Sequence, residues 1–233
     1  MMIALGIDTS EELGGVAMVS LSADGEEFCD ELLFDAPMSH GKRLTAAIEQ
    51  LLARREVKIT DIHAVCLNRG PGSFTGLRIG IAFAQGLCQS LNIPLVGIRG
   101  IDSYRARADA ENLCVLVKDR REIVYTAWFK EGSQRDEVEA MNIAEVINRA
   151  EQEGEMIFIG SGADLFRQRL ETITGAIVAH KRFNRPSPVQ IIRLALAEEI
   201  DFKSNSLCII EPFYVTKPLA EKKVKGLRIE ARG

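Results

Sequence analysis

Two short segments carry residues that could hold a phosphate group. Asp8, Thr9 and Ser10 follow the first apolar segment, and Gly70-Pro71-Gly72-Ser73 follows a later one. A carboxylate at such a place can position Mg²⁺ or water for phosphoryl transfer, and a glycine-rich turn before a helix can bind an anion through backbone amides. A nucleotide site built in this way would use Asp8, Thr9, Ser10, Gly70, Gly72 and Ser73.

The same residues also have a purely structural interpretation. Asp, Thr and Ser side chains bind local amides in turns, and Ser73 or Thr75 can cap the helix that follows. Gly76, Gly80 and Ala84 recur every four residues, so one face of that helix is smooth enough for close packing against a sheet or another protein. Both interpretations stay open on the residues alone.

Other kinds of catalytic site lack their sequence signatures. The glycine spacing G-x-G-x-x-x-G differs from the dinucleotide fingerprint, and no G-K-[ST] follows it. His40, His63 and His180 do not form H-E-x-x-H or H-x-x-x-H, and no G-x-S-x-G is present. We therefore expect no metal ligands and no catalytic residues of these kinds.

The composition is that of an ordinary globular protein. The chain has 233 residues, of which 46% are hydrophobic and 27% charged, and its net charge is −4. That charge argues against strong nucleic-acid binding by the chain alone. The five cysteines form no C-x-x-C pair, and we find neither a signal peptide nor an uncharged apolar stretch of about 18 residues, so we expect a cytoplasmic protein without membrane contact.

Two similar series of elements must position these residues. We expect strands at 2–7, 14–22 and 27–36, with a hairpin turn at Asp24-Gly25 between the last two. A helix at 39–55 capped by Ser39, a strand at 63–68, a helix at 75–92 and a strand at 93–98 follow. The second series has strands at 112–118, 122–130, 136–142, 156–160 and 175–180, with helices at 143–153, 163–173 and 188–200. Two β-β-β-α-β-α units predict an α/β fold with two lobes, 1–105 and 106–233, which resembles the ASKHA superfamily of actin, hexokinase and Hsp70 ATPases.

Several motifs closely resemble the TsaB (YeaZ) family, which belongs to the bacterial machinery that makes threonylcarbamoyladenosine in tRNA. They are IDTS (7–10), SHGKRL (39–44) and NRGPGSFTGLRIGIAFAQGL (68–87). KDRREIVYTAWF (118–129) and EPFYVTKP (211–218) resemble two further family segments. The match is strongest over 1–105. Departures from the family pattern are Asn68 in place of glycine, Arg99-Gly100 in place of Ser-Thr, and Thr216 in place of arginine.

The resemblance implies a non-catalytic scaffold or activator. Such a protein pairs with the catalytic subunit TsaD, is joined by the ATPase TsaE, and serves to form N6-threonylcarbamoyladenosine at position 37 of tRNAs reading ANN codons. The resemblance also implies a homodimer when the chain is alone, tRNA contact only through the complex, and no cofactor of its own, with ATP or ADP at the complex interface.

The resemblance further implies that pairing uses the two helices of the first lobe. The interface residues would be His40, Arg43, Leu44, Ala47, Ile48, Leu51, Thr75, Arg78, Ile79, Ala82, Phe83 and Gly86. On the second helix, two stripes of residues are alternative candidates for the contact with the partner. One holds Leu77, Arg78, Ile81, Ala82 and Gln85, and the other holds Ile79 and Phe83.

Two other functions remain open on the sequence. The first is an ATP-dependent transferase or kinase that uses Asp8 and the glycine segment. The second is a glycoprotease-type metallopeptidase, for which the metal ligands are missing. The tail lysines are either a solvated tail or a tRNA contact; they are Lys217, Lys222, Lys223 and Lys225.

Overall fold

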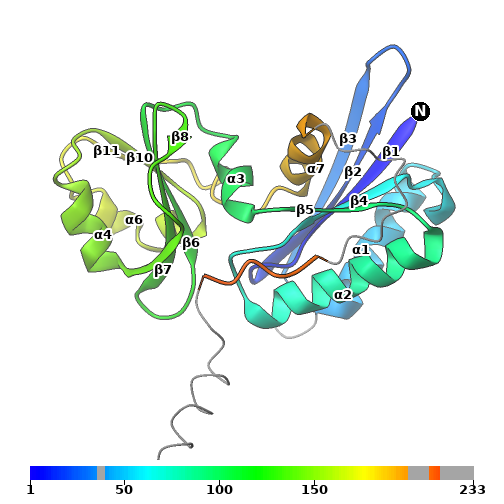
Figure 1. The fold of residues 1–233 in the computed structure, drawn as a ribbon, viewed down its shortest axis with the longest axis horizontal. Helices are drawn as coiled ribbons and strands as arrows, with labels where there is room; N and C mark the ends of the chain where they lie inside the picture. The colour runs from blue at the N-terminus through cyan, green and yellow to red at the C-terminus, as the bar shows by residue number, and fades with distance from the viewer. Residues whose placement is uncertain (36–39, 199–209, 216–233) are drawn as a thin grey trace, which may run out of the picture.

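The computed structural model describes residues 1–35, 40–198 and 210–215, and these contain two β-sheets (Figure 1). The strands of the first sheet are β1 (Met2–Asp8), β2 (Leu13–Leu21), β3 (Glu27–Asp35), β4 (Ala64–Asn68) and β5 (Leu95–Ile98). Their order is β3-β2-β1-β4-β5, with antiparallel pairing among β1, β2 and β3 and parallel pairing among β1, β4 and β5. The predicted turn at Asp24-Gly25 lies between β2 and β3, where Gly25 has φ +86°.

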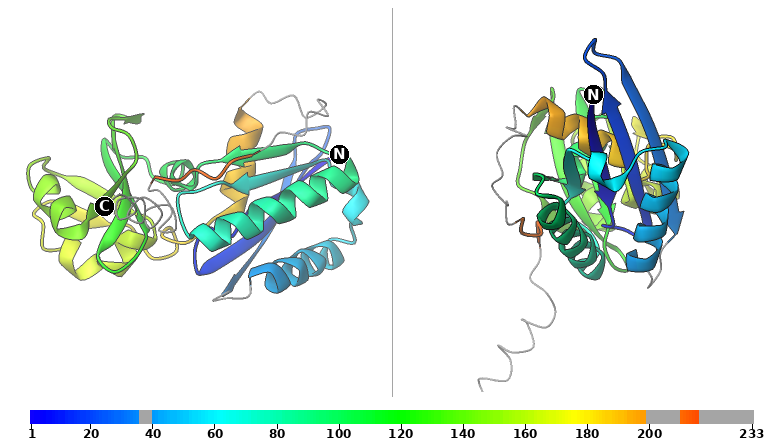
Figure 2. Two further views of the ribbon diagram at one scale, coloured as in Figure 1. Left: turned by 60° about the horizontal axis from the view of Figure 1, so that its bottom comes forward. Right: turned by 90° about the vertical axis from the view of Figure 1, so that its right-hand side faces the viewer.

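Helices cover both faces of the first sheet. They are α1 (His40–Arg54), α2 (Phe74–Leu91) and α7 (Pro188–Ala197). Helices α1 and α2 lie side by side on one face, and α7 lies on the other (Figure 2). Ile3, Leu5 and Ile7 of β1 therefore point into one core and Ala4 into a second core, which explains why this strand is apolar throughout.

The second sheet has six strands. They are β6 (Asn112–Lys118), β7 (Ile123–Lys130), β8 (Ser133–Gln134), β9 (Glu139–Asn142), β10 (Met156–Ile159) and β11 (Ala176–Val178). Five follow the order β11-β10-β6-β7-β8, and β9 pairs with β7. The helices here are α4 (Ile143–Ala150), α5 (Ser161–Leu165) and α6 (Arg167–Leu170). Helix α3 (Gly100–Arg105) lies between the two sheets, and a short 3₁₀ helix, η1 (Ile59–Asp61), precedes β4 (Figure 1).

The predicted elements occur in the predicted order, but the short elements α3, β8 and η1 were not predicted, and two predicted helices differ from expectation. The helix expected at 163–173 is broken into α5 and α6, because Phe166 has φ −106° and ψ 19° and leaves the helical conformation. Helix α7 follows the second sheet in the chain but packs on the first, where Val189, Ile191 and Ile192 meet Ala4 and Cys66. The predicted cap Ser39 lies outside the described residues. Within the described ranges, no helix is both long and apolar enough to cross a membrane.

Candidate functional site

The carboxylate of Asp8 is enclosed by the protein itself. Asp8 ends β1 and is 1% exposed. Its Oδ1 accepts hydrogen bonds from the backbone N–H of Ser10 at 2.9 Å and the hydroxyl of Ser10 at 2.7 Å, and its Oδ2 accepts one from Asn68 Nδ2 at 2.9 Å. Burial raises the pKa of Asp8, while the hydrogen bonds from Asn68 and Ser10 lower it in part. Both carboxylate oxygens are thus engaged inside the chain.

The side chain of Asn68 forms hydrogen bonds with both segments that were predicted to hold a phosphate group. Its Nδ2 donates to Asp8 and also to Ser10 Oγ at 2.9 Å, and its Oδ1 accepts from the backbone N–H of Gly70 at 2.8 Å. The sequence marked Asn68 only as a departure from the family pattern. A polar side chain that ends an otherwise apolar strand was the available signal that it had a partner.

The glycines of the loop and helix pack against the turn at residues 8–10. A Cβ atom at Gly72 would collide with the carbonyl oxygen of Ser10, and one at Gly76 with that of Thr9. Thr9 Oγ1 donates to the carbonyl oxygen of Gly76 at 2.8 Å. These glycines therefore allow α2 to approach the end of β1 closely, which is the structural interpretation of the motif.

Of the two candidate caps of α2, Ser73 and Thr75, the structure shows that Ser73 is the cap. Its Oγ accepts from the backbone N–H of Gly76 at 3.2 Å, and its own N–H donates to the carbonyl oxygen of Ser10 at 2.6 Å. Two of the amides near the N-terminus of α2 are thus bound to the protein's own atoms.

A cleft of about 680 Å³ lies between the two lobes, next to this turn. Of the six predicted nucleotide-binding residues, only Ser10 and Ser73 line it. Its other lining residues are Glu11, Glu12, Leu13, Asp35, Thr75, Lys118, Asp119 and Ser161. Because four of these are carboxylates and one is a lysine, the cleft disfavours a bare phosphate.

The cations near the cleft already have anionic partners. Lys118 Nζ pairs with Glu12 at 3.2 Å, and Arg120 lies 3.8 Å from a carboxylate oxygen of Asp119. Among the described residues, no group of three or more His, Cys, Asp or Glu side chains is arranged to hold a metal ion. His63 Nδ1 accepts from the N–H of Ile3, and His180 Nδ1 from that of Arg182, both at 3.3 Å.

Glu11 connects the first lobe to α3 and to the second lobe. The hydroxyl of Tyr104 donates to Glu11 Oε1 at 2.8 Å. Burial raises the pKa of Glu11 to about 7, against the lowering effect of its hydrogen bonds with Ser161 and Tyr104. The guanidinium of Arg107 lies 4.7 Å from the centre of the Tyr104 ring, and burial lowers its pKa. This partly buried group of Glu11, Tyr104 and Arg107 was not predicted from the sequence, because its members come from separate segments.

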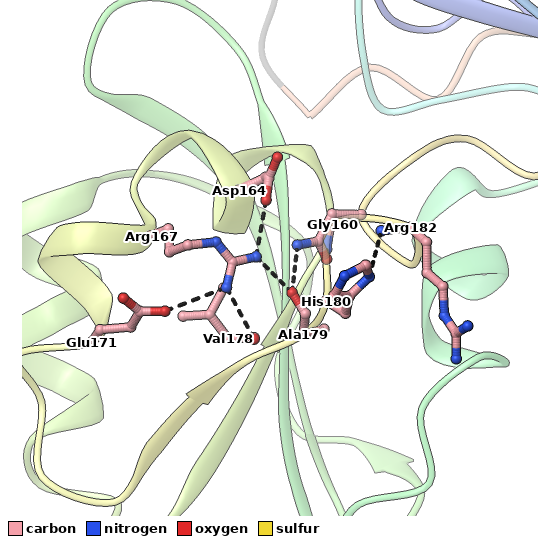
Figure 3. A network of polar contacts seen from close by, with 9 residues as sticks. Gly160, Asp164, Arg167, Glu171, Val178, Ala179, His180 and Arg182 are labelled. Atoms are coloured by element: carbon pink, nitrogen blue, oxygen red, sulfur yellow. Dashed lines mark hydrogen bonds and ion pairs between the residues drawn. The ribbon is translucent and has the colours of Figure 1, made fainter.

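A second polar network lies at the edge strand of the second sheet (Figure 3). Arg167 donates to the carbonyl oxygens of Val178 at 3.2 Å and Ala179 at 2.7 Å. It also pairs with Asp164 at 2.9 Å and Glu171 at 3.3 Å. Its hydrogen bonds satisfy backbone groups where β11 ends, so we assign it a structural role.

Four of the predicted interface residues on α1 are buried inside the first lobe. Leu44, Ala47, Ile48 and Leu51 are at most 7% exposed and belong to the core beneath the first sheet. Apolar residues at helical spacing mark the face that packs inward, and these four residues form that face of α1. Arg43 is exposed, and the side chain of His40 lies outside what the structure describes.

On α2 the structure separates the inward face from the outward one. Leu77 and Ile81 are buried, so neither can serve an outward stripe. Thr75, Arg78, Ala82 and Gly86 are exposed, and Ile79 and Phe83 are half-buried. The exposed part of the predicted interface therefore consists of Arg43, Thr75, Arg78, Ile79, Ala82, Phe83 and Gly86.

Comparison with known proteins places these features in a family. The family described as "TsaD: tRNA N6-adenosine threonylcarbamoyltransferase" matches residues 35–224. The chain is 27% identical to the tRNA threonylcarbamoyladenosine biosynthesis protein TsaB of Escherichia coli (strain K12), over 95% of this chain and 98% of that protein. It is also 27% identical to the protein of the same name from Haemophilus influenzae, over 95% and 97% of the two chains.

Solved structures share the two-lobed fold. YeaZ from Pseudomonas aeruginosa has a TM-score of 0.66 at 22% identity, covering 92% of this chain and 100% of that one. An inorganic polyphosphate/ATP-glucomannokinase from Arthrobacter has a TM-score of 0.51 at 14% identity, covering 85% and 100%. These likenesses confirm the predicted two-lobed α/β fold. The chain therefore belongs to the TsaD family, and its resemblance to the TsaB (YeaZ) proteins within that family is confirmed.

Proposed function

We propose that this protein is a non-catalytic subunit of the system that forms N6-threonylcarbamoyladenosine at position 37 of tRNAs reading ANN codons. It pairs with a TsaD-type catalytic subunit in the cytoplasm, and TsaE joins the pair. The chain contacts tRNA only as part of this complex. The observation that carries the proposal is the closed turn at residues 8–10. Asp8 has both oxygens bound by Ser10 and Asn68, and the glycine segment packs against the same turn, so neither is free for chemistry.

The surface proposed for pairing is the outward side of the adjacent helices α1 and α2. On α2, Ala82 and Gly86 are small and exposed, so a partner helix can approach closely there. Phe83 and Ile79 flank them with half-buried apolar area, and Arg43 and Arg78 add charge at exposed positions. When no TsaD-type subunit is present, the same surface serves a homodimer.

Co-purification with the TsaD-type subunit of the same organism tests this function. The variants Ala82→Glu and Gly86→Glu place a charge at exposed positions of α2 and should abolish pairing while thermal unfolding stays cooperative. Thr174→Glu is the matched control, because Thr174 is exposed on the second lobe. A glutamate at Ile48 is unsuitable, since Ile48 is 4% exposed and the variant would report unfolding. Pairing that survives both surface variants contradicts the proposed surface.

A second experiment tests the role in tRNA modification. Cells that lack this protein should lose N6-threonylcarbamoyladenosine from their tRNAs, as measured by mass spectrometry of nucleosides. Restoring the wild-type chain should restore the modification, and Ala82→Glu should not. A normal level of the modification in the depleted cells refutes the proposed function.

An ATP-dependent transferase or kinase is the second candidate. The size of the cleft, about 680 Å³, and the likeness to a glucomannokinase fold favour it, whereas the four carboxylates that line the cleft oppose the binding of phosphate groups. It predicts turnover of ATP with Mg²⁺ by the purified chain, whereas the scaffold proposal predicts none, with ATP or ADP bound only at the interface of the complex. A glycoprotease-type peptidase has no supporting metal site among the described residues.

A further inference from the structure

Residues 210–215, which we call the strap, cross from one lobe to the other (Figure 1, orange). Ile210 packs against the core of the first lobe, and Val215 packs against the core that α3 shares with the second sheet. The strap also contacts the glycine loop, because the N–H of Phe213 donates to the carbonyl oxygen of Arg69 at 2.6 Å. It is therefore held at both ends and in the middle.

The strap orients one exposed arginine of α2. The ring of Tyr214 stacks on that of Phe74, with 5.0 Å between ring centres. The guanidinium of Arg78 lies 3.8 Å from the centre of the Phe74 ring, and its Nε donates to the Tyr214 hydroxyl at 3.2 Å. Arg78 is thus fixed by two aromatic residues of separate segments.

Among the residues that the structure describes, this arginine has no anionic partner. Arg78 is exposed, and it forms no ion pair with any residue in the ranges 1–35, 40–198 and 210–215. An arginine that is already oriented loses little side-chain entropy when it meets a carboxylate, and it can bind the carboxylate through two parallel hydrogen bonds.

A groove of about 490 Å³ separates α2 from the strap beside Arg78. One wall is α2 and the other is the strap, and the lining residues are Arg78, Ile81, Ala82, Gln85, Glu211, Pro212 and Tyr214. The groove combines one cation, one carboxylate and apolar surface. Glu211 would repel a run of acidic residues, so the groove fits a single carboxylate with apolar neighbours.

We propose that the strap and α2 together form a docking groove for an acidic side chain of the partner protein, with Arg78 as its ion-pair partner. The inference rests on the proposed function, because the partner is the TsaD-type subunit. Beyond that function, the inference places residues of the strap in the interface and assigns Tyr214 the role of orienting Arg78. Arginine and tyrosine in such central positions often dominate binding energies.

The test measures the dissociation constant between the full-length chain and the TsaD-type subunit by calorimetry. Arg78→Glu should weaken binding by about 30-fold or more, as expected when one partner of an interfacial charge pair is lost. Tyr214→Phe removes only the hydroxyl that accepts from Arg78, keeps the stacked ring, and should weaken binding by about 3-fold to 10-fold. Arg185→Glu is the control, because Arg185 is exposed and lies away from the groove.

Charge reversal in the partner separates direct pairing from a structural effect. Each exposed acidic residue of the TsaD-type subunit is replaced in turn by arginine, and one such variant should restore binding to Arg78→Glu but not to wild type. Unchanged affinity for Arg78→Glu and Tyr214→Phe overturns the inference and leaves the proposed function intact. Absence of any rescuing variant also overturns it. Failure of the unaltered chain to bind the subunit overturns both.

Discussion

Replacing Gly76 with alanine should destabilise the protein, although alanine favours helices. Gly76 lies in the first turn of α2, and its helical backbone accepts alanine without strain. A Cβ atom there would collide with the carbonyl oxygen of Thr9, which belongs to the backbone and cannot rotate away. Either α2 or the turn at residues 8–10 must therefore move.

The size of the effect follows from the contacts that this movement breaks. Two hydrogen bonds join the segments, from Thr9 Oγ1 to the Gly76 carbonyl at 2.8 Å and from the Ser73 N–H to the Ser10 carbonyl at 2.6 Å. Losing both costs about 2–4 kcal/mol, because Thr9, Ser10 and Gly76 stay buried. The higher helix propensity of alanine stabilises the folded variant by about 1 kcal/mol. We expect a net loss of about 1–3 kcal/mol in the free energy of unfolding.

Urea unfolding followed by circular dichroism measures this loss, and Gly86→Ala is its internal control. Gly86 is in the same helix, is exposed, and has nothing within 4 Å of an added Cβ. That variant should gain about 0.5–1 kcal/mol. If Gly76→Ala proves as stable as Gly86→Ala, the glycines do not serve close packing, and the structural interpretation of the glycine motif is refuted.

Two further changes test the buried groups. Glu11→Gln should alter the pH dependence of stability. Because the folded pKa of about 7 exceeds the ordinary glutamate value of 4.5, the contribution of Glu11 is full below about pH 4.5 and is lost as the pH rises through about 7. Urea unfolding should therefore show that the free energy of unfolding of Glu11→Gln rises relative to that of wild type between pH 5 and pH 8. A difference in free energy that stays constant with pH would contradict the raised pKa. Ile48→Ala should cost about 2–5 kcal/mol of unfolding free energy, because Ile48 is 4% exposed. Gln50→Ala, at an exposed position of the same helix, should change it by less than about 0.5 kcal/mol, and equal effects would place Ile48 on the surface.

Local patterns predicted the elements of this protein well. The apolar runs at β1, β4 and β6 and the turn at Gly25 are signals within a few residues, and each gave the right kind of element. The cap Ser73 was also found, because a serine that precedes a helix acts on amides only three residues away. The helix at 163–173 was expected to be continuous, since nothing in the local sequence requires the break at Phe166.

The site needed contacts that no local pattern contains. Asp8 and Asn68 are 60 residues apart and meet only because β1 and β4 are neighbours in the sheet. The spacing of Leu44 and Ile48 revealed an apolar face on α1 but could not say whether the core or a partner covers it.

The sequence by itself determined most of the strands and helices and their order, the glycine turn that opens α2 and the family motifs, because these depend on residue type and short periodic spacing. Tertiary structure alone decided that α7 returns to the first sheet, that the glycines face Thr9 and Ser10, and that Tyr214 reaches Arg78 across 136 residues. The physical reason is that such contacts arise when whole elements pack to bury apolar area, and packing brings together side chains whose types alone do not name their partners.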